Sequence, residues 1–128
     1  MTESPFKGKT GVSRIIQALF NTLAGLVDAY MHESAFRQEL LLAGILLPIA
    51  ILLPVTTIER VALIASVLLV LIVELLNSSV EAAIDRISLD LHPLSKRAKD
   101  TGSAAVLMSL VLLAVTWGLI VMPLVLSR

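Results

Sequence analysis

One stretch, residues 73–85, constrains this chain more than any other. An apolar run over residues 61–73 continues directly into a segment that carries carboxylates. Helical spacing places its polar side chains on one stripe of one helix, which comprises Glu74, Asn77, Ser78, Glu81 and Asp85. Glu74 lies roughly 20 Å along that helix, still within a hydrocarbon core of about 30 Å. An ionisable group at such a depth is costly unless something faces it, so a functional role is its default interpretation.

The composition agrees with a membrane setting. Of the 128 residues, 57% are hydrophobic, which predicts a small integral membrane protein rather than a soluble domain. Basic and acidic residues number 10 each, so the net charge gives no indication of a nucleic acid or of an acidic partner. The chain has no cysteine, which excludes disulfides, thiolate metal sites and thiol redox chemistry.

The hydrophobic pattern predicts a single all-α membrane domain over residues 1–128. Residues 11–32 have one apolar and one polar side, as in an amphipathic helix on the membrane surface; a soluble helix packed on a core is the alternative. Longer apolar runs predict transmembrane helices over about 36–58, 61–85 and 102–126. Residues 85–101 are expected to form a polar connection, broken at residues 92–93, with residues 100–103 capping the last helix.

The basic residues predict the orientation. Most of them fall on the side of the N-terminus and of the second connection, namely Lys7, Lys9, Arg14, Arg37, Arg86, Lys96, Arg97 and Lys99. Arg60 and Arg128 lie on the opposite side. The excess of positive charge predicts that the N-terminus and the acidic stripe face the cytoplasm, the compartment that contains ATP.

Many acidic groups collect at this one membrane level, together with an amide and a lysine. The set comprises Glu33, Glu39, Glu74, Asn77, Glu81, Asp85, Asp90, Lys99 and Asp100. A magnesium nucleotide requires oxygen ligands for Mg²⁺, a cation for the phosphates and a base near the accepting hydroxyl. Glu74 is the deepest carboxylate and the best placed to act as a base on the hydroxyl of a lipid. Lys99 could assist phosphate binding beside the N-terminus of the last helix.

Each of these residues also has a plainer interpretation. Glu74 could be a structural acid paired across a helix interface, and the other acids could be solvated charges near the membrane. The lysines could act only as topology determinants near anionic headgroups. His92 is equally well explained as a turn residue, and Tyr30 and Trp117 as interfacial anchors.

Three separated segments, in one register without gaps, closely resemble the bacterial integral-membrane diacylglycerol kinases. They are residues 33–39, 73–86 and 95–106, and the likeness extends from about Gly11 to Trp117. The resemblance implies a homotrimer in the bacterial inner membrane, each subunit with three transmembrane helices and a surface helix. It implies phosphorylation of diacylglycerol to phosphatidic acid by MgATP. The implied partners are ATP, diacylglycerol, membrane lipids and further copies of the chain, with no nucleic acid.

The resemblance also implies roles for individual residues. Glu74 would be the catalytic base, with Asn77 orienting it or the phosphoryl group, and Asp85 would be a supporting residue. Glu33 and Glu81 would hold Mg²⁺. The nucleotide site would comprise Arg14, Glu33, Glu81, Asp90, His92, Lys99 and Asp100. Lipid contacts would come from Arg14, Ala18, Tyr30, Ala35, Phe36, Arg37, Gln38, Glu39, Glu74, Ser103 and Trp117.

The chain departs from the family pattern at three positions. Asn21 stands where the family usually has an aromatic residue near the nucleotide, Tyr30 where it has a tryptophan, and Leu91 where an aromatic residue is common. These departures concern how the adenine and the acyl chains are held.

Three rival functions remain open at this stage. The same chemistry could act on another lipid alcohol, such as undecaprenol. The acidic stripe could instead line an ion pathway, or the chain could be a structural subunit of a larger complex. Three transmembrane helices enclose Glu74, Asn77 and Glu81 poorly, so we expect a second subunit to supply the missing wall of the site.

Overall fold

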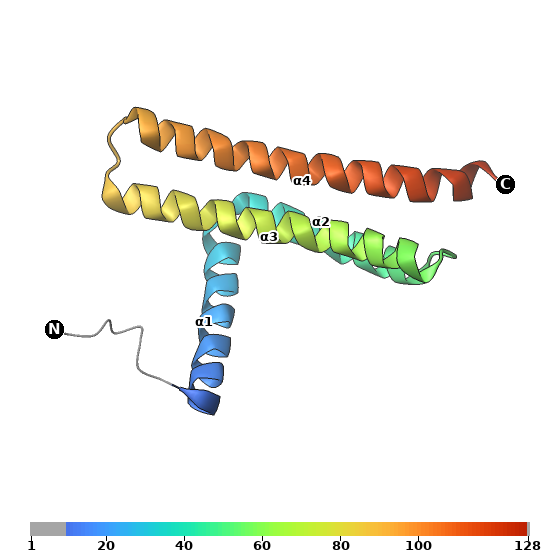
Figure 1. Ribbon diagram of the computed structural model, residues 1–128, viewed down its shortest axis with the longest axis horizontal. Coiled ribbons are helices and arrows are strands. Elements are labelled where there is room, and N and C mark those ends of the chain that lie inside the picture. Colours follow the sequence, from blue (N-terminus) through green and yellow to red (C-terminus); the bar gives the residue numbers. More distant parts are fainter. Residues whose placement is uncertain (1–9, 128) are drawn as a thin grey trace.

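A computed structural model describes residues 10–127, and these form four helices and no strand. The helices are α1 (Gly11–His32), α2 (Ser34–Leu52), α3 (Thr57–Ile87) and α4 (Pro93–Leu126). α3 packs against both α2 and α4, and the three form an antiparallel bundle from which α1 projects sideways (Figure 1). The predicted all-α class is confirmed. Lys7, Lys9 and Arg128, which entered the prediction of orientation, lie outside the described residues.

Three of the helices, α2, α3 and α4, are long and apolar enough to cross a membrane. At 1.5 Å per residue, α3 and α4 are about 46 Å and about 51 Å long, whereas a hydrocarbon core is about 30 Å thick. Both helices therefore extend well beyond the core at one end. Their apolar residues occupy the end away from the α3–α4 connection, and the acidic stripe of α3 lies toward that connection.

The start of α4 differs from the sequence-based expectation. The helix begins at Pro93, so residues 93–101 are helical rather than a polar connection, and residues 100–103 lie inside the helix rather than at its cap. A proline is favourable at the first helical position because its φ is already helical and its missing N–H has no partner to lose. His92 caps the helix, since its Nδ1 accepts a hydrogen bond of 3.1 Å from the backbone N–H of Leu94.

The junction between α2 and α3 is also tighter than expected. α2 ends at Leu52 rather than near residue 58, because Pro54 disfavours a helical conformation in the residue before it. α3 then begins with a capping box. The Oγ1 of Thr56 accepts from the N–H of Glu59 at 3.2 Å, and the N–H of Thr56 donates to Glu59 Oε1 at 3.0 Å. Residues 57–60 therefore make the first turn of α3, although the sequence predicted the start of this helix at residue 61.

The corner between α1 and α2 is a single residue, Glu33, which ends one helix and begins the next. Arg37 holds this corner: its Nη1 donates to the carbonyl oxygens of Tyr30 at 2.6 Å and of Met31 at 3.3 Å. A cation at the C-terminus of a helix is favourable because it meets the negative end of the helix dipole. Arg37 thus fixes the direction in which α1 leaves the bundle and the place of Glu33.

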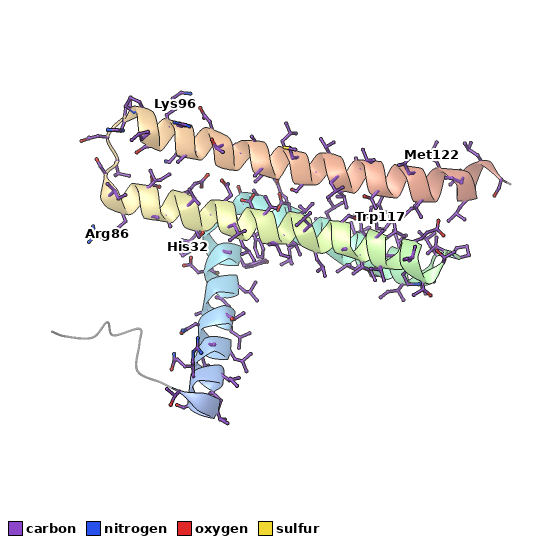
Figure 2. The ribbon with its side chains drawn as sticks, viewed as in Figure 1. His32, Arg86, Lys96, Trp117 and Met122 are labelled. Carbon is purple, nitrogen blue, oxygen red and sulfur yellow. The ribbon has the colours of Figure 1, made fainter. Side chains whose placement is uncertain are left out.

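The buried core is small and lies in the middle of the bundle. Its cluster consists of Ala43, Val67, Val70 and Leu113, against which Trp117 packs. The indole Nε1 of Trp117 donates to the carbonyl oxygen of Leu63 at 3.3 Å, so this ring faces α3 (Figure 2). Trp117 was expected at the membrane interface and in contact with lipid, and the structure places much of its side chain inside the bundle.

The capping box gives a test of the fold. Replacing Thr56→Ala removes a side-chain hydrogen bond to the first turn of α3, so we expect the free energy of unfolding to fall by about 1 kcal/mol. Unfolding of the detergent-solubilised protein by denaturant measures this change. Thr57→Ala, at the next position, is the matched control because its exposed side chain makes no hydrogen bond within residues 10–127. Equal stability of the two variants would contradict the capping assignment.

Candidate active site

An open groove of about 370 Å³, here called the acidic groove, lies between the start of α2 and the two helices α3 and α4. It is lined by Glu33, Ser34, Ala35, Glu74, Asn77, Glu81, Ser103, Val106, Leu107 and Leu110. Residues from three separate parts of the sequence therefore meet in one place. The corner held by Arg37 brings Glu33 to the acidic stripe of α3, and the antiparallel packing of α4 brings Ser103 opposite it.

Glu74 is the most enclosed carboxylate of the described residues, with an exposed fraction of only 4%. It interacts electrostatically with Glu33 and Glu81, and Glu39 interacts with it from α2. No lysine or arginine is among the residues that line the acidic groove. Like charges gathered in an enclosed place repel one another unless a cation or a proton compensates them, so the groove is built to receive positive charge.

Asn77 connects the acidic groove with the contact between α3 and α4. Its Nδ2 donates to Glu81 Oε1 at 3.4 Å, one turn further along the same helix. Its Oδ1 is buried without a hydrogen-bond partner among residues 10–127, as is Oε2 of Glu39. Buried polar atoms are seldom left unpaired in proteins, so Oε2 of Glu39 is a candidate to accept a donor that comes from outside the chain.

The acidic groove offers carboxylate ligands for a hard cation whose remaining ligands come from water or from a bound phosphate. Within residues 10–127, no group of three or more His, Asp or Glu side chains is arranged to hold a metal ion. Magnesium usually takes only one or two protein carboxylates and completes its shell with phosphate oxygens and water. Glu33 and Glu81, which line the same groove, meet that requirement.

A second groove of about 670 Å³, here called the connection groove, lies between the end of α3 and the start of α4. Its lining includes Asp85, Asp90, His92, Lys99 and Asp100, all predicted nucleotide or supporting residues. The structure therefore brings these residues together, but in a groove separate from Glu33, Glu74 and Glu81. The two grooves meet along α3, where Glu81 and Asp85 are one turn apart, about 6 Å along the helix axis.

Two ion pairs occupy the connection groove. Lys99 Nζ lies 2.9 Å from Asp85 Oδ1, and Lys96 Nζ lies 2.6 Å from Asp100 Oδ2. Figure 2 shows Lys96 at the end of the bundle where α3 and α4 are connected. Ion pairs as exposed as these contribute little to stability, so Lys99 can leave Asp85 for a phosphate at small cost. The sequence reasoning missed Lys96 as the partner of Asp100, although the four-residue spacing within a helix was a signal for it.

The predicted residues on α1 lie apart from both grooves. Arg14, Ala18, Asn21 and Tyr30 are exposed and line neither groove. Among the predicted lipid contacts on α2, Phe36 is buried within the chain, whereas Gln38 is exposed. A single chain therefore places the three glutamates in one groove and Lys99 in another, and no residue of α1 lines either groove.

Comparison with known proteins identifies the family. Residues 20–121 match the family described as prokaryotic diacylglycerol kinase. This chain belongs to that family. The diacylglycerol kinase of Pseudomonas aeruginosa is 53% identical over 122 residues, which cover 95% of this chain and 99% of that protein. The diacylglycerol kinase of Escherichia coli K12 is 48% identical over 108 residues, 84% of this chain and 88% of the relative. That of Helicobacter pylori 26695 is 41% identical over 116 residues, 91% of this chain and 90% of the relative.

Membership of the prokaryotic diacylglycerol kinase family makes this chain a membrane-embedded lipid kinase, and a kinase requires a nucleotide substrate. The family assignment from the three sequence segments is thereby confirmed.

The exposed Lys99–Asp85 pair gives a test of the connection groove. We expect Asp85→Asn to lower the free energy of unfolding only slightly, and high salt to remove most of the difference. Asp90→Asn is the control, because Asp90 lines the same groove without an ion pair among the described residues. Unfolding in low-salt and high-salt detergent solution measures both. A loss several times larger for Asp85→Asn would mean that Lys99 is held too firmly to exchange its partner.

Proposed function

We propose that this chain transfers the γ-phosphate of MgATP to the primary hydroxyl of diacylglycerol and so produces phosphatidic acid. The observation that carries the proposal is the acidic groove, in which a buried carboxylate and two further carboxylates are brought together by helices able to cross a membrane. The names of the relatives support diacylglycerol as the substrate. We place the protein in the bacterial inner membrane, with its N-terminus and the acidic groove on the cytoplasmic side.

In this proposal Glu74 is the general base. The lipid hydroxyl gives its proton to the Glu74 carboxylate while its oxygen bonds to the γ-phosphorus and the bond to the ADP oxygen breaks. Val106, Leu107 and Leu110 line the same groove, so the apolar part of the lipid can lie against α4 while its hydroxyl reaches Glu74. The burial of Glu74 in a rigid helix fixes the geometry of this proton transfer.

Glu33 and Glu81 fit the carboxylate ligands of the nucleotide-bound Mg²⁺. When bound, Mg²⁺ neutralises the charge that develops on the transferred phosphoryl group. Asn77 fixes Glu81 through its 3.4 Å hydrogen bond, and Lys99 is available to contact phosphate oxygens from the connection groove. Asp90, His92 and Asp100 border that groove and would contact the rest of the nucleotide, together with Arg14.

The active assembly in this proposal is a homotrimer with sites shared between subunits. The residues proposed for one site lie in two grooves and on α1, which borders neither groove. The acidic groove is open, and α1 presents a long row of exposed apolar residues, including Ile15, Leu19 and Leu23. A neighbouring subunit can close the groove, while the membrane surface covers the apolar side of α1.

The assignment of Glu74 can be tested by phosphate transfer from radiolabelled ATP to diacylglycerol in mixed micelles. Since general base catalysis contributes about 10²–10⁴-fold, Glu74→Gln should lower kcat by at least about 100-fold. Glu59→Gln makes the same substitution in the first turn of the same helix, far from the acidic groove, and should retain wild-type kcat.

Other outcomes separate the rivals. Phosphorylation of undecaprenol with none of diacylglycerol would change the substrate. An inactive wild type with ion flux in liposomes that depends on Glu74 would replace the kinase proposal by an ion pathway.

The metal assignment predicts a different kinetic change. Glu81→Gln removes a proposed carboxylate ligand, so the Mg²⁺ concentration for half-maximal activity should rise at least about tenfold at fixed ATP. Glu59→Gln again serves as the control. A Mg²⁺ requirement unchanged in both Glu33→Gln and Glu81→Gln would show that the metal is held elsewhere.

A further inference from the structure

Gly102 differs from the other glycines that the structure describes. A Cβ added to Gly25, Gly44 or Gly118 would have no neighbouring heavy atom within 4 Å. A Cβ added to Gly102 would overlap the Oδ1 of Asn77 and lie 3.3 Å from its Cγ. The methyl group that glycine lacks would therefore occupy the space in which the Asn77 amide lies.

The backbone gives no reason for a glycine at this position. Gly102 lies well inside α4, and within residues 10–127 only Gly11 has a positive φ. Glycine lowers helix stability relative to alanine because it loses more conformational freedom on folding. The backbone conformation therefore does not require a glycine at position 102. The Asn77 side chain does, because it occupies the space that a Cβ would need.

The Asn77 amide is held at both ends. Its Nδ2 donates to Glu81 Oε1, and its Oδ1 lies beside Gly102 at the contact between α3 and α4. A Cα hydrogen of Gly102 occupies the direction of the absent Cβ, which permits a weak C–H···O contact with Oδ1. Asn77 also lines an apolar groove of about 600 Å³ on the other side of this contact, together with Gly102. The Asn77 amide therefore lines both this apolar groove and the acidic groove.

We propose that Gly102 is a positioning residue for Asn77: its missing side chain creates the space that keeps the amide between α3 and α4 and directed at Glu81. The inference rests on the proposed function, in which Asn77 and Glu81 belong to the catalytic groove. It adds a residue on α4 whose effect on the reaction passes through Asn77.

A methyl group at position 102 has a specific consequence. Oδ1 is the end of a side chain, so the amide can rotate away without separating the two helices. That rotation breaks the bond from Nδ2 to Glu81 and removes the amide from its place in the groove. The fold should therefore survive Gly102→Ala, while the geometry around the proposed metal ligand changes.

The kinetic test compares alanine substitutions at two glycines of the same helix. Since small misplacements at an active site cost up to about 100-fold, Gly102→Ala should lower kcat by about 10- to 100-fold. The KM for diacylglycerol should stay within about twofold, because the lipid-facing side chains are unchanged. Gly118→Ala is the matched control on α4 and should retain wild-type kcat. Wild-type kcat in Gly102→Ala would overturn the inference.

A double variant decides whether the effect passes through Asn77. In an Asn77→Ala background the methyl group at position 102 has room, so Gly102→Ala should cause no further loss of kcat. Losses that multiply in the double variant would overturn the inference. If Gly102→Ala alone does not fold, recovery of the folded protein in the double variant supports the inference, and no recovery contradicts it.

Thermal unfolding supplies a readout that does not depend on activity. Gly102→Ala should lower the Tm when Asn77 is present and raise it when position 77 is alanine, because the clash is gone and alanine favours the helix. Gly118→Ala should raise the Tm in both backgrounds. An inactive wild type would contradict the proposed kinase function but leave this sign change to decide the inference. An active wild type without the sign change would contradict the inference alone.

Discussion

The enclosure of Glu74 within an apolar bundle is the constraint on which the rest of the structure depends. A carboxylate with an exposed fraction of 4% is costly unless its charge is compensated, and the acidic groove is lined by no lysine or arginine. The groove instead adds Glu33 and Glu81, which increases the negative charge. Such an arrangement is unfavourable for the protein alone. In the proposed function, a cation and its bound phosphates compensate this charge.

The length of α3 determines how far apart the residues of the candidate site lie. One continuous helix of 31 residues carries the apolar span, the buried Glu74, the groove residue Glu81 and the ion-paired Asp85. Because the helix is rigid, the lipid-facing and the water-facing parts of the site stay at a fixed separation. The extension of α4 back to Pro93 has the same effect on the other side, since it places Lys99 and Ser103 on one rigid element. The connection between α3 and α4 is correspondingly short, which holds the two helices together near the site.

The tight corner at Glu33 brings one carboxylate to the acidic groove while α1 leaves the bundle. α1 and α2 are separated by one residue, and Arg37 binds the last carbonyl groups of α1. Glu33 therefore lies at the N-terminal end of α2, beside the acidic stripe, while α1 is directed away from the bundle (Figure 1). Within residues 10–127, this geometry leaves the apolar side of α1 exposed. It agrees with a protein that is completed by the membrane and by other subunits.

The sequence by itself determined the class of the fold and which residues of α3 share one face. Apolar runs fix the number of spanning helices, and the spacing of Glu74, Asn77 and Glu81 fixes their common stripe, because both are local properties of a helix. The start of α4 was predicted less well. Because residues 93–101 are polar, they were expected to form a connection, but they belong to the helix, which His92 caps and Pro93 begins. Contacts between distant segments could not be predicted in the same way. The separation of the acidic groove from the connection groove, the pairing of Lys99 with Asp85 and the space that Gly102 leaves for Asn77 all depend on how α4 packs against α3. Only the tertiary structure decided these features, because helix periodicity specifies which residues share a face but not which residue of another helix lies opposite them.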